Sequence, residues 1–249
     1  MPVKTSVKTI GILGFGAFGN LIAEHLCAHF ELVVCDPALT EDSYVPERVQ
    51  IGDVAEVGRC DLVILALPIE ALAASIKELR AYLQPGCIVA DVVSVKIKPV
   101  EIMRDLLPPF VEIIGTHPLF GPQSARNGIA GRKISLCPVR GNSASRVAAF
   151  LRLVLGLKVY ITTPEEHDKE AAIVQGITHL VAKVLVRMEP LPTRLTTASF
   201  EKLMQATDMV RDDAANVFLA IERDNPFSAE MRERFFEIAN QIKGELEGH

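Results

Sequence analysis

Short apolar runs alternate with amphipathic segments along the first two thirds of the chain. Six runs are rich in valine and isoleucine and nearly continuous in hydrophobicity, as is typical of strands buried on both faces of a sheet; they span residues 8–14, 31–36, 48–52, 61–68, 87–95 and 112–116. Segments with helical periodicity lie between several of them, at residues 17–29, 69–83 and 97–106. This alternation predicts a parallel sheet wrapped by helices. Two further runs extend the sheet on either side of a helix near 143–155, at residues 132–139 and 157–162.

The pattern changes after Thr163, where strands give way to long helices. Helical periodicity covers residues 164–189, 196–224 and 227–246, and proline-containing segments separate the three. We therefore predict an α/β protein with a doubly wound sheet in a domain over residues 1–162, followed by an all-helical domain over residues 163–249. Three helices bury little core by themselves, so we expect the helical domain to pair with a second copy as a homodimer.

The first apolar run leads into a glycine-rich turn. Gly14, Gly16 and Gly19 have the GxGxxG spacing, follow the first strand and open the first helix, an arrangement typical of a Rossmann-type domain that binds a dinucleotide pyrophosphate. The second run ends at Asp36, where a carboxylate binds the ribose 2′-hydroxyl and repels a 2′-phosphate, so we predict NAD rather than NADP. A simple cap of the Asp-Pro turn is the alternative for Asp36. The predicted cofactor contacts are Gly14, Phe15, Gly16, Ala17, Phe18, Gly19, Asp36, Leu67 and Pro68.

Two polar segments are expected beyond the carboxyl ends of the fifth and sixth strands, where open α/β sheets bind their ligands. The first, DVVSVKIKPV, holds Ser94 and Lys96 where the strand gives way to a helix, and the alternative for Ser94 is a helix N-cap. The second, GTHPLFGP, sets His117 among two prolines and two glycines. We expect this segment to be a rigid loop that holds His117 near Ser94. A histidine hydrogen-bonded within the turn is the alternative.

Four motifs together carry a resemblance to a known family. The GxGxxG turn, DVVSVK (91–96), GTHPLFGP (115–122) and EEHDKEAAIVQGITHLVA (165–182) resemble the prephenate/arogenate dehydrogenases of tyrosine biosynthesis. The resemblance runs over most of the chain and is loosest after about residue 190. The QGITH form is more similar to the plant and related bacterial arogenate dehydrogenases than to the enterobacterial type. Because no chorismate mutase or regulatory segment flanks the motifs, we expect a minimal stand-alone enzyme.

The resemblance implies an oxidative decarboxylation of arogenate or prephenate, with hydride transfer to a nicotinamide cofactor. The products would be tyrosine or 4-hydroxyphenylpyruvate, together with CO2. His117 would accept the proton of the substrate 4-hydroxyl, which suits a neutral imidazole, and Ser94 would hold the same hydroxyl as the second catalytic residue. The substrate contacts implied are Ser94, Thr116, His117, Gln175, Thr178 and His179.

The first long helix has a polar stripe that supports a substrate-binding role for this helix. Asp168, Gln175 and His179 lie near one stripe, and the apolar side is formed by Ile173, Ile177, Leu180, Val184 and Met188. A histidine satisfied within an interface is the alternative for His179. His167 and Asp168 match the start of the family segment, with a helix cap as their alternative.

The substrate carries two carboxylates, so the site needs a cation. Arg211 is the candidate, with Asp208 three residues before it, and a solvated ion pair between them is the alternative. The C-terminal arginine motif of bacterial prephenate dehydrogenases is not clearly present. Asp208 lies, in a loose comparison, where the plant-type enzymes carry an acidic residue. An acid there favours the amine of arogenate over the ketone of prephenate.

The composition argues against a membrane-spanning, a nucleic-acid-binding and a metal-binding protein. The chain is 49% hydrophobic with a net charge of −5, has no apolar run long enough to span a membrane, and has no basic patch for nucleic acid. Its five cysteines lack metal-site or disulfide spacing, so we expect free thiols, no metal and a cytoplasmic location. Two alternatives stay open: a β-hydroxyacid dehydrogenase that uses Lys169 as acid/base, and a non-catalytic NAD-sensing module.

Overall fold

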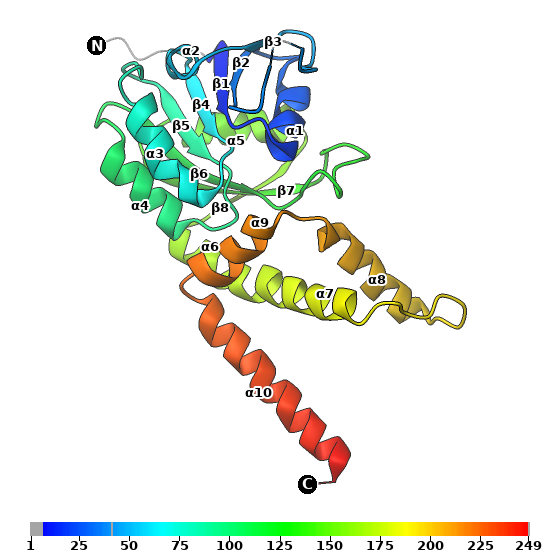
Figure 1. Ribbon diagram of the computed structural model, residues 1–249. Helices are drawn as coiled ribbons and strands as arrows, with labels where there is room; N and C mark the ends of the chain where they lie inside the picture. The colour runs from blue at the N-terminus through cyan, green and yellow to red at the C-terminus, as the bar shows by residue number, and fades with distance from the viewer. Residues whose placement is uncertain (1–6, 41, 249) are drawn as a thin grey trace. The chain divides into compact units, whose positions relative to one another are not determined.

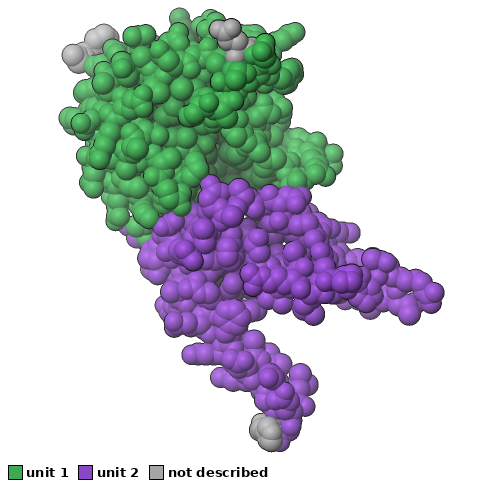
Figure 2. Space-filling model, viewed as in Figure 1, with its two compact units in different colours: residues 1–164 green, residues 165–249 purple. Residues whose placement is uncertain are grey.

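The computed structural model describes residues 7–40 and 42–248 (Figure 1). The chain divides into two compact units, residues 1–164 and 165–249, shown in different colours in Figure 2. The division falls two residues beyond the boundary expected from the change of pattern. Each unit is described by itself below.

Unit 1 is built on one eight-stranded sheet with the order β3-β2-β1-β4-β5-β6-β7-β8. The strands are β1 (Thr9–Leu13), β2 (Glu31–Cys35), β3 (Val49–Ile51), β4 (Leu62–Leu65), β5 (Ile88–Asp91), β6 (Glu112–Pro118), β7 (Lys133–Arg140) and β8 (Lys158–Ile161). The first six are mutually parallel, and their order turns back between β1 and β4, at the crevice where doubly wound sheets bind ligands. This arrangement confirms the Rossmann-type α/β fold.

The last two strands do not continue the parallel sheet. β7 runs antiparallel to β6, and β8 pairs in parallel with β7. The apolar runs predicted both strands, but a run of buried residues has the same appearance in either direction. The reversal matters for the site, because it extends β6 beyond the end of its parallel partner β5.

Helices cover both faces of the sheet (Figure 1). α1 (Ala17–Leu26) and α5 (Ala144–Leu153) pack on one face, in a core that includes Ile12, Ile64 and Leu136. α2 (Val54–Gly58), α3 (Ile69–Leu79) and α4 (Ile97–Leu106) pack on the other, in a core that includes Val63, Leu65 and Ile113. The pattern did not predict α2, whose sequence signal is the capping box between Asp53 and Glu56.

Unit 2 is helical, with more breaks than the pattern predicted. Its elements are α6 (Pro164–Ala171), η1 (Ala172–Gly176), α7 (Ile177–Arg187), α8 (Ala198–Arg211), α9 (Ala215–Leu219), η2 (Ala220–Asp224) and α10 (Ser228–Glu247). The expectation of continuous helices over 164–189 and 196–224 was therefore wrong. A π-helical turn, η1, lies inside the first, and residues 212–214 break the second, where Asp212 and Asp213 are weak helix formers.

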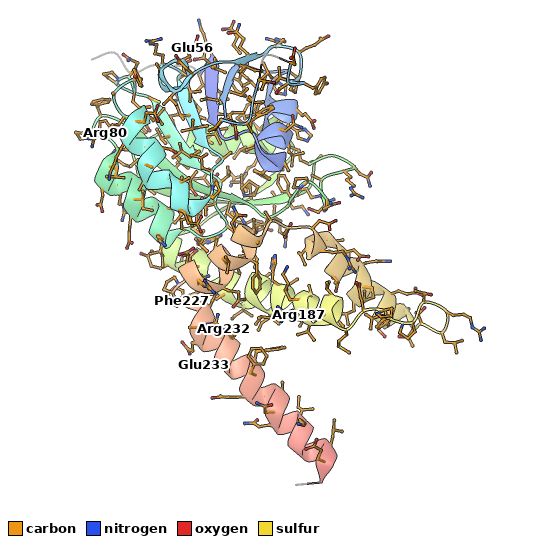
Figure 3. All side chains as sticks on the ribbon, in the orientation of Figure 1. Glu56, Arg80, Arg187, Phe227, Arg232 and Glu233 are labelled. Carbon is orange, nitrogen blue, oxygen red and sulfur yellow. The ribbon has the colours of Figure 1, made fainter. Side chains whose placement is uncertain are left out.

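The two π-helical turns pack against each other near Gly176. A Cβ atom added at Gly176 would lie 3.3 Å from Glu222 Oε1, so a small residue is needed there. Arg232, labelled in Figure 3, has Nη1 2.8 Å from Glu222 Oε2 and donates to the Glu222 carbonyl oxygen at 2.9 Å. This pairing ties α10 to η2 at its first turns.

The polar and apolar sides of the first long helix are reversed relative to a simple amphipathic helix. Asp168 and His179 are 0% and 5% exposed, whereas Ile173 and Met188 are 54% and 59% exposed. α10 buries only Ser228 among its described residues and extends past the other helices of unit 2 (Figure 1). Its exposed apolar side chains include Phe236, Ile238, Ile242 and Leu246.

Candidate active site

The glycine turn between β1 and α1 is shaped by close backbone contacts. Gly14 has φ +99°, and a Cβ atom there would lie 2.3 Å from the carbonyl oxygen of Ala66. A Cβ atom on Gly19 would lie 2.2 Å from the Gly14 carbonyl oxygen, so only glycine lets the helix approach the turn. At Gly16, by contrast, a Cβ atom would meet nothing within 4 Å. This open position in the turn is where the backbone can approach a pyrophosphate.

The N-terminus of α1 is suited to an anion. Its N-cap is Gly16, no side chain caps it, and its first turn has no acidic residue. The helix dipole and the free N–H groups therefore face the turn without a competing negative charge. The neighbouring contacts predicted for the cofactor also lie around this turn: Leu67 Cδ2 would lie 3.0 Å from a Cβ atom on Gly14, Pro68 is the N-cap of α3, and Phe18 packs on Phe120.

Asp36, directly after β2, combines the two roles considered for it. Its Oδ1 accepts from the Ala38 N–H at 2.8 Å, which caps the Asp-Pro turn. Its Oδ2 accepts from the Phe15 N–H at 2.7 Å, which holds the glycine turn against the end of β2. Each carboxylate oxygen has two lone pairs, so both retain capacity for a ribose hydroxyl. The residues present fit a dinucleotide.

His117 lies in a strand, not in a loop, which corrects the expectation for GTHPLFGP. The parallel pairing of β6 with β5 ends at Gly115, but antiparallel pairing with β7 carries β6 on through Thr116, His117 and Pro118. The loop begins only at Leu119. His117 is 4% exposed and lies directly opposite Ser135 of β7. The rigidity of this histidine therefore comes from a sheet ladder as well as from the prolines.

A buried network joins the ends of β5 and β6. The Lys96 ammonium contacts Asp91 Oδ2 and donates to the Thr116 carbonyl oxygen at 2.5 Å, and all three residues are buried. The Thr116 hydroxyl donates in turn to the Asp91 carbonyl oxygen at 2.5 Å. Burial raises the pKa of Asp91, and the adjacent Lys96 opposes that rise. Lys96 thus anchors the residue before His117.

Ser94 lies in the sequence between Asp91 and Lys96, the two residues of the buried ion pair. It is three residues beyond the end of β5 and half-buried, in the segment that connects Asp91 to Lys96. It does not cap α4, because the N-cap of that helix is Lys96. The N-cap alternative is therefore wrong. Ser94, three residues after β5, and His117, in the part of β6 that extends beyond its pairing with β5, lie at the carboxyl ends of neighbouring strands.

The predicted residues of unit 2 cluster around η1. Gln175 lies in this π-helical turn, a feature frequent at functional sites. His179 Nδ1 is 2.9 Å from the Gln175 carbonyl oxygen, which requires a proton on Nδ1, and its Nε2 is 3.2 Å from Asp213 Oδ2. Thr178 is exposed, and its hydroxyl donates to the Val174 carbonyl oxygen at 2.6 Å. Sequence reasoning missed Asp213, which only the break after α8 brings to His179.

His167 and Asp168 form a buried pair near the N-terminus of α6. His167 Nδ1 is 2.8 Å from Asp168 Oδ1, and the Asp168 carbonyl oxygen accepts from Asn225 Nδ2 at 2.8 Å. Lys169, the alternative acid/base, is exposed, and its Nζ lies 5.4 Å from the centroid of the Phe227 ring.

Arg211 is paired with two acidic residues. Its Nη2 is 2.6 Å from Glu189 Oε1, and its Nε donates to Asp208 Oδ1 at 3.0 Å. These hydrogen bonds raise the pKa of Arg211, and the bond from Arg211 lowers the pKa of Glu189. The ion pair with Asp208 is thus present, while Glu189 was not predicted because it lies 22 residues away in sequence.

Metal clusters, membrane-spanning helices and disulfide bonds are absent from the described part of the chain. Among residues 7–40 and 42–248, no group of three His, Cys, Asp or Glu side chains could hold a metal ion. Within the same ranges, no helix is both long and apolar enough to cross a membrane. None of the five cysteines is in a disulfide bond.

The doubly wound sheet, the uncapped glycine turn and the acidic residue after β2 define a dinucleotide-binding protein of the Rossmann type. The family model for the nucleotide-binding domain of prephenate dehydrogenase matches residues 47–163. Over these residues the chain is similar to the prephenate/arogenate dehydrogenase family.

Relatives of known name extend the similarity over nearly the whole chain. It is 28% identical to arogenate dehydrogenase 1, chloroplastic, of Arabidopsis thaliana, in a match covering 96% of this chain and 39% of that protein. It is also 28% identical to arogenate dehydrogenase 2, chloroplastic, of the same plant, covering 98% of this chain and 72% of that protein. The chain therefore spans well under half of the first relative.

A solved structure has the same fold. Prephenate dehydrogenase from A. aeolicus, in complex with hydroxyphenyl propionate and NAD+, aligns with a TM-score of 0.73 at 22% identity. The alignment covers 96% of this chain and 91% of that chain.

Proposed function

We propose that this chain catalyses the oxidative decarboxylation of arogenate or prephenate, with hydride transfer to a nicotinamide cofactor. The observation that carries the proposal is the position of His117. It is a buried histidine held at the carboxyl edge of a dinucleotide-binding sheet, anchored through Thr116 and followed by Pro118. Similarity to the prephenate/arogenate dehydrogenases supports the reaction, and two of the similar proteins are named arogenate dehydrogenases.

The reaction has two stages, hydride transfer and decarboxylation, and each stage moves one proton and one electron pair. When bound, NAD+ accepts the hydride that leaves C4 of the substrate ring. His117 takes the proton of the C4 hydroxyl, so the oxygen becomes a carbonyl oxygen. The C1 carboxylate then leaves as CO2, and its bonding electron pair passes through the ring to that oxygen, which regains a proton from His117 to give a phenol. A neutral imidazole suits both proton transfers near neutral pH.

NAD is the preferred cofactor in this proposal. Asp36 holds the glycine turn with one carboxylate oxygen and keeps acceptor capacity for the ribose 2′-hydroxyl. A 2′-phosphate would bring negative charge against the same carboxylate, so NADP binding is disfavoured. Contacts from Gly14, Phe15, Gly16, Ala17, Phe18, Gly19, Leu67 and Pro68 complete the cofactor site.

In this proposal the substrate contacts of unit 1 are Ser94, Thr116 and His117, and those of unit 2 are Gln175, Thr178, His179 and Arg211. Gln175, Thr178 and His179 surround the π-helical turn, and Arg211 supplies the cation for a carboxylate. Arg211 would exchange its bond to Glu189 for one to the substrate. The carboxylate of Asp208 is largely exposed and can accept a hydrogen bond from the amine of arogenate, which favours arogenate over prephenate.

The proposed enzyme acts as a homodimer through unit 2 and in a reducing compartment, the cytoplasm. The apolar side of α7 and the length of α10 support the dimer, because they expose large aliphatic side chains that a second copy would bury. Five cysteines without a disulfide bond are consistent with this compartment.

The variant His117→Asn tests the proposal. We expect kcat to fall by about 10²–10⁴-fold, the usual contribution of a general base, with a modest change in KM. Initial rates are measured as NADH formation and CO2 release, with arogenate and prephenate as substrates. Asn127, in the loop after β6, provides a matched control in which Asn127→Ala leaves kcat unchanged. A His117→Asn enzyme with full kcat would remove the base, and an absence of CO2 from the wild type would reject the reaction.

A further inference from the structure

The hydroxyl of Ser135 is a buried polar group without a hydrogen-bond partner. Ser135 lies on β7 and is 4% exposed, and its Oγ has no acceptor or donor within hydrogen-bond distance. Nearly all buried polar groups in proteins are hydrogen-bonded, so an exception calls for a specific reason. The main chain of β6 beside it is paired with β7, and none of its groups bonds this hydroxyl.

Ser135 faces the same side of the sheet as His117. The two residues are directly opposite in the antiparallel pair, where opposed side chains share a face. Two residues further along the same pair, a Cβ atom on Gly115 would lie 3.4 Å from Cys137 Cβ and 3.4 Å from Lys96 Cδ. Because side chains alternate along strands, His117 and Ser135 share this face with Lys96.

We propose that Ser135 donates a hydrogen bond to the reacting oxygen of the substrate, the one that gives its proton to His117. This inference rests on the proposed function. That oxygen begins as a hydroxyl, becomes a carbonyl oxygen as hydride leaves, and takes up the electron pair released by decarboxylation. A donor placed against it binds the developing negative charge more strongly than the starting hydroxyl, and so lowers the barrier more than it aids binding.

The position explains why the hydroxyl is left without a partner in the protein alone. A donor that bonded a neighbouring side chain would have to break that bond when the substrate arrives. A donor held on a paired strand, with no internal partner, needs no such rearrangement and is preorganised for the ligand.

The variant Ser135→Ala tests this role through turnover. We expect kcat to fall by about 10–100-fold with KM changed by less than about threefold, in the direction found when an oxyanion donor is removed. Ser135→Thr retains the hydroxyl and should recover most of the activity. Ser145→Ala, at an exposed serine of α5, is the matched control and should behave as wild type.

Binding measurements separate this role from a structural one. The probes are 3-(4-hydroxyphenyl)propionate and 3-phenylpropionate, which differ only in the ring hydroxyl, each titrated in the presence of NAD+. The ratio of the affinity for 3-(4-hydroxyphenyl)propionate to that for 3-phenylpropionate should fall by about tenfold in Ser135→Ala, at a pH where the phenol of the bound probe ionises. The affinity for 3-phenylpropionate itself should be unchanged. A merely structural serine would lower both affinities equally and reduce the thermal stability of the free enzyme.

The outcomes distinguish the two proposals. Wild-type enzyme that produces no CO2 would reject the proposed function itself. Active wild-type enzyme, combined with full kcat and an unchanged probe preference in Ser135→Ala, would overturn the role of Ser135 alone.

Discussion

The ion pair between Asp91 and Lys96 connects the stability of unit 1 to the position of its catalytic base. Both side chains are 0% exposed, and the ammonium of Lys96 also bonds the carbonyl oxygen of Thr116. Asp91 Oδ1 has no hydrogen-bond partner, so Lys96 is the principal compensation for this buried carboxylate. Lys96→Met preserves most of the aliphatic stem and removes the ammonium group, with its charge and its hydrogen bond to Thr116.

The magnitude follows from this burial. Removing one partner of a buried ion pair typically costs about 3–5 kcal/mol, because the other charge is left uncompensated, whereas replacing both partners is often nearly neutral. We therefore expect Lys96→Met to lose about 3–5 kcal/mol at pH 7, and the double variant Asp91→Asn, Lys96→Met to lose less than the sum of the single variants by at least about 2 kcal/mol.

The pH dependence has a definite sign. Burial already raises the pKa of Asp91, and loss of Lys96 removes the two largest opposing effects, so the pKa rises further in Lys96→Met. A raised pKa means that the folded protein holds this proton more tightly than the unfolded chain. The stability it contributes is present below the unfolded pKa and lost as pH rises through the folded pKa. The deficit of Lys96→Met should therefore shrink on acidification.

Urea unfolding followed by tyrosine fluorescence is the assay. The chain has no tryptophan, and its three tyrosines, Tyr44, Tyr82 and Tyr160, all lie in unit 1, so the signal reports this unit. The same variant should lower kcat, because β6 loses its anchor at Thr116. A double variant whose loss equals the sum of the two single losses, or a deficit independent of pH, would refute the reasoning.

Two further predictions concern the cofactor and the oligomer. Asp36→Asn should lower kcat/KM with NAD by about 10–100-fold, as expected for a lost hydrogen bond to a charged group, and should raise kcat/KM with NADP. Asp42→Asn, at an exposed position, is the control. An unchanged ratio of kcat/KM for the two cofactors would contradict the role of Asp36. Ile242→Asp, at a half-exposed position of α10, should shift the protein from dimer to monomer in sedimentation velocity with its helical content retained, whereas Glu245→Gln should not; a wild-type monomer at micromolar concentration would reject the dimer.

The sequence by itself determined the features that depend on local periodicity and local backbone shape. Apolar runs identified all eight strands, and the clearest runs are those of β4 and β5, which are buried on both faces and so have no polar side. The GxGxxG spacing identified the turn at Gly14, because a positive φ and two close approaches exclude larger residues. Asp36, Ser94 and His117 were found at strand ends, because the parallel order of an α/β sheet brings those ends to one edge.

Only the tertiary structure decided how distant segments pair, and several site properties follow from that pairing. The antiparallel contact of β6 with β7 turns the expected loop at His117 into a strand and sets Ser135 opposite it. The ammonium of Lys96 is compensated in the interior by contacts with Asp91 and Thr116, which lie far from each other in sequence. The break after α8 brings Asp213 to His179. Local patterns carry the conformation of each segment, whereas the register between strands and the packing between helices depend on contacts between residues far apart in the sequence.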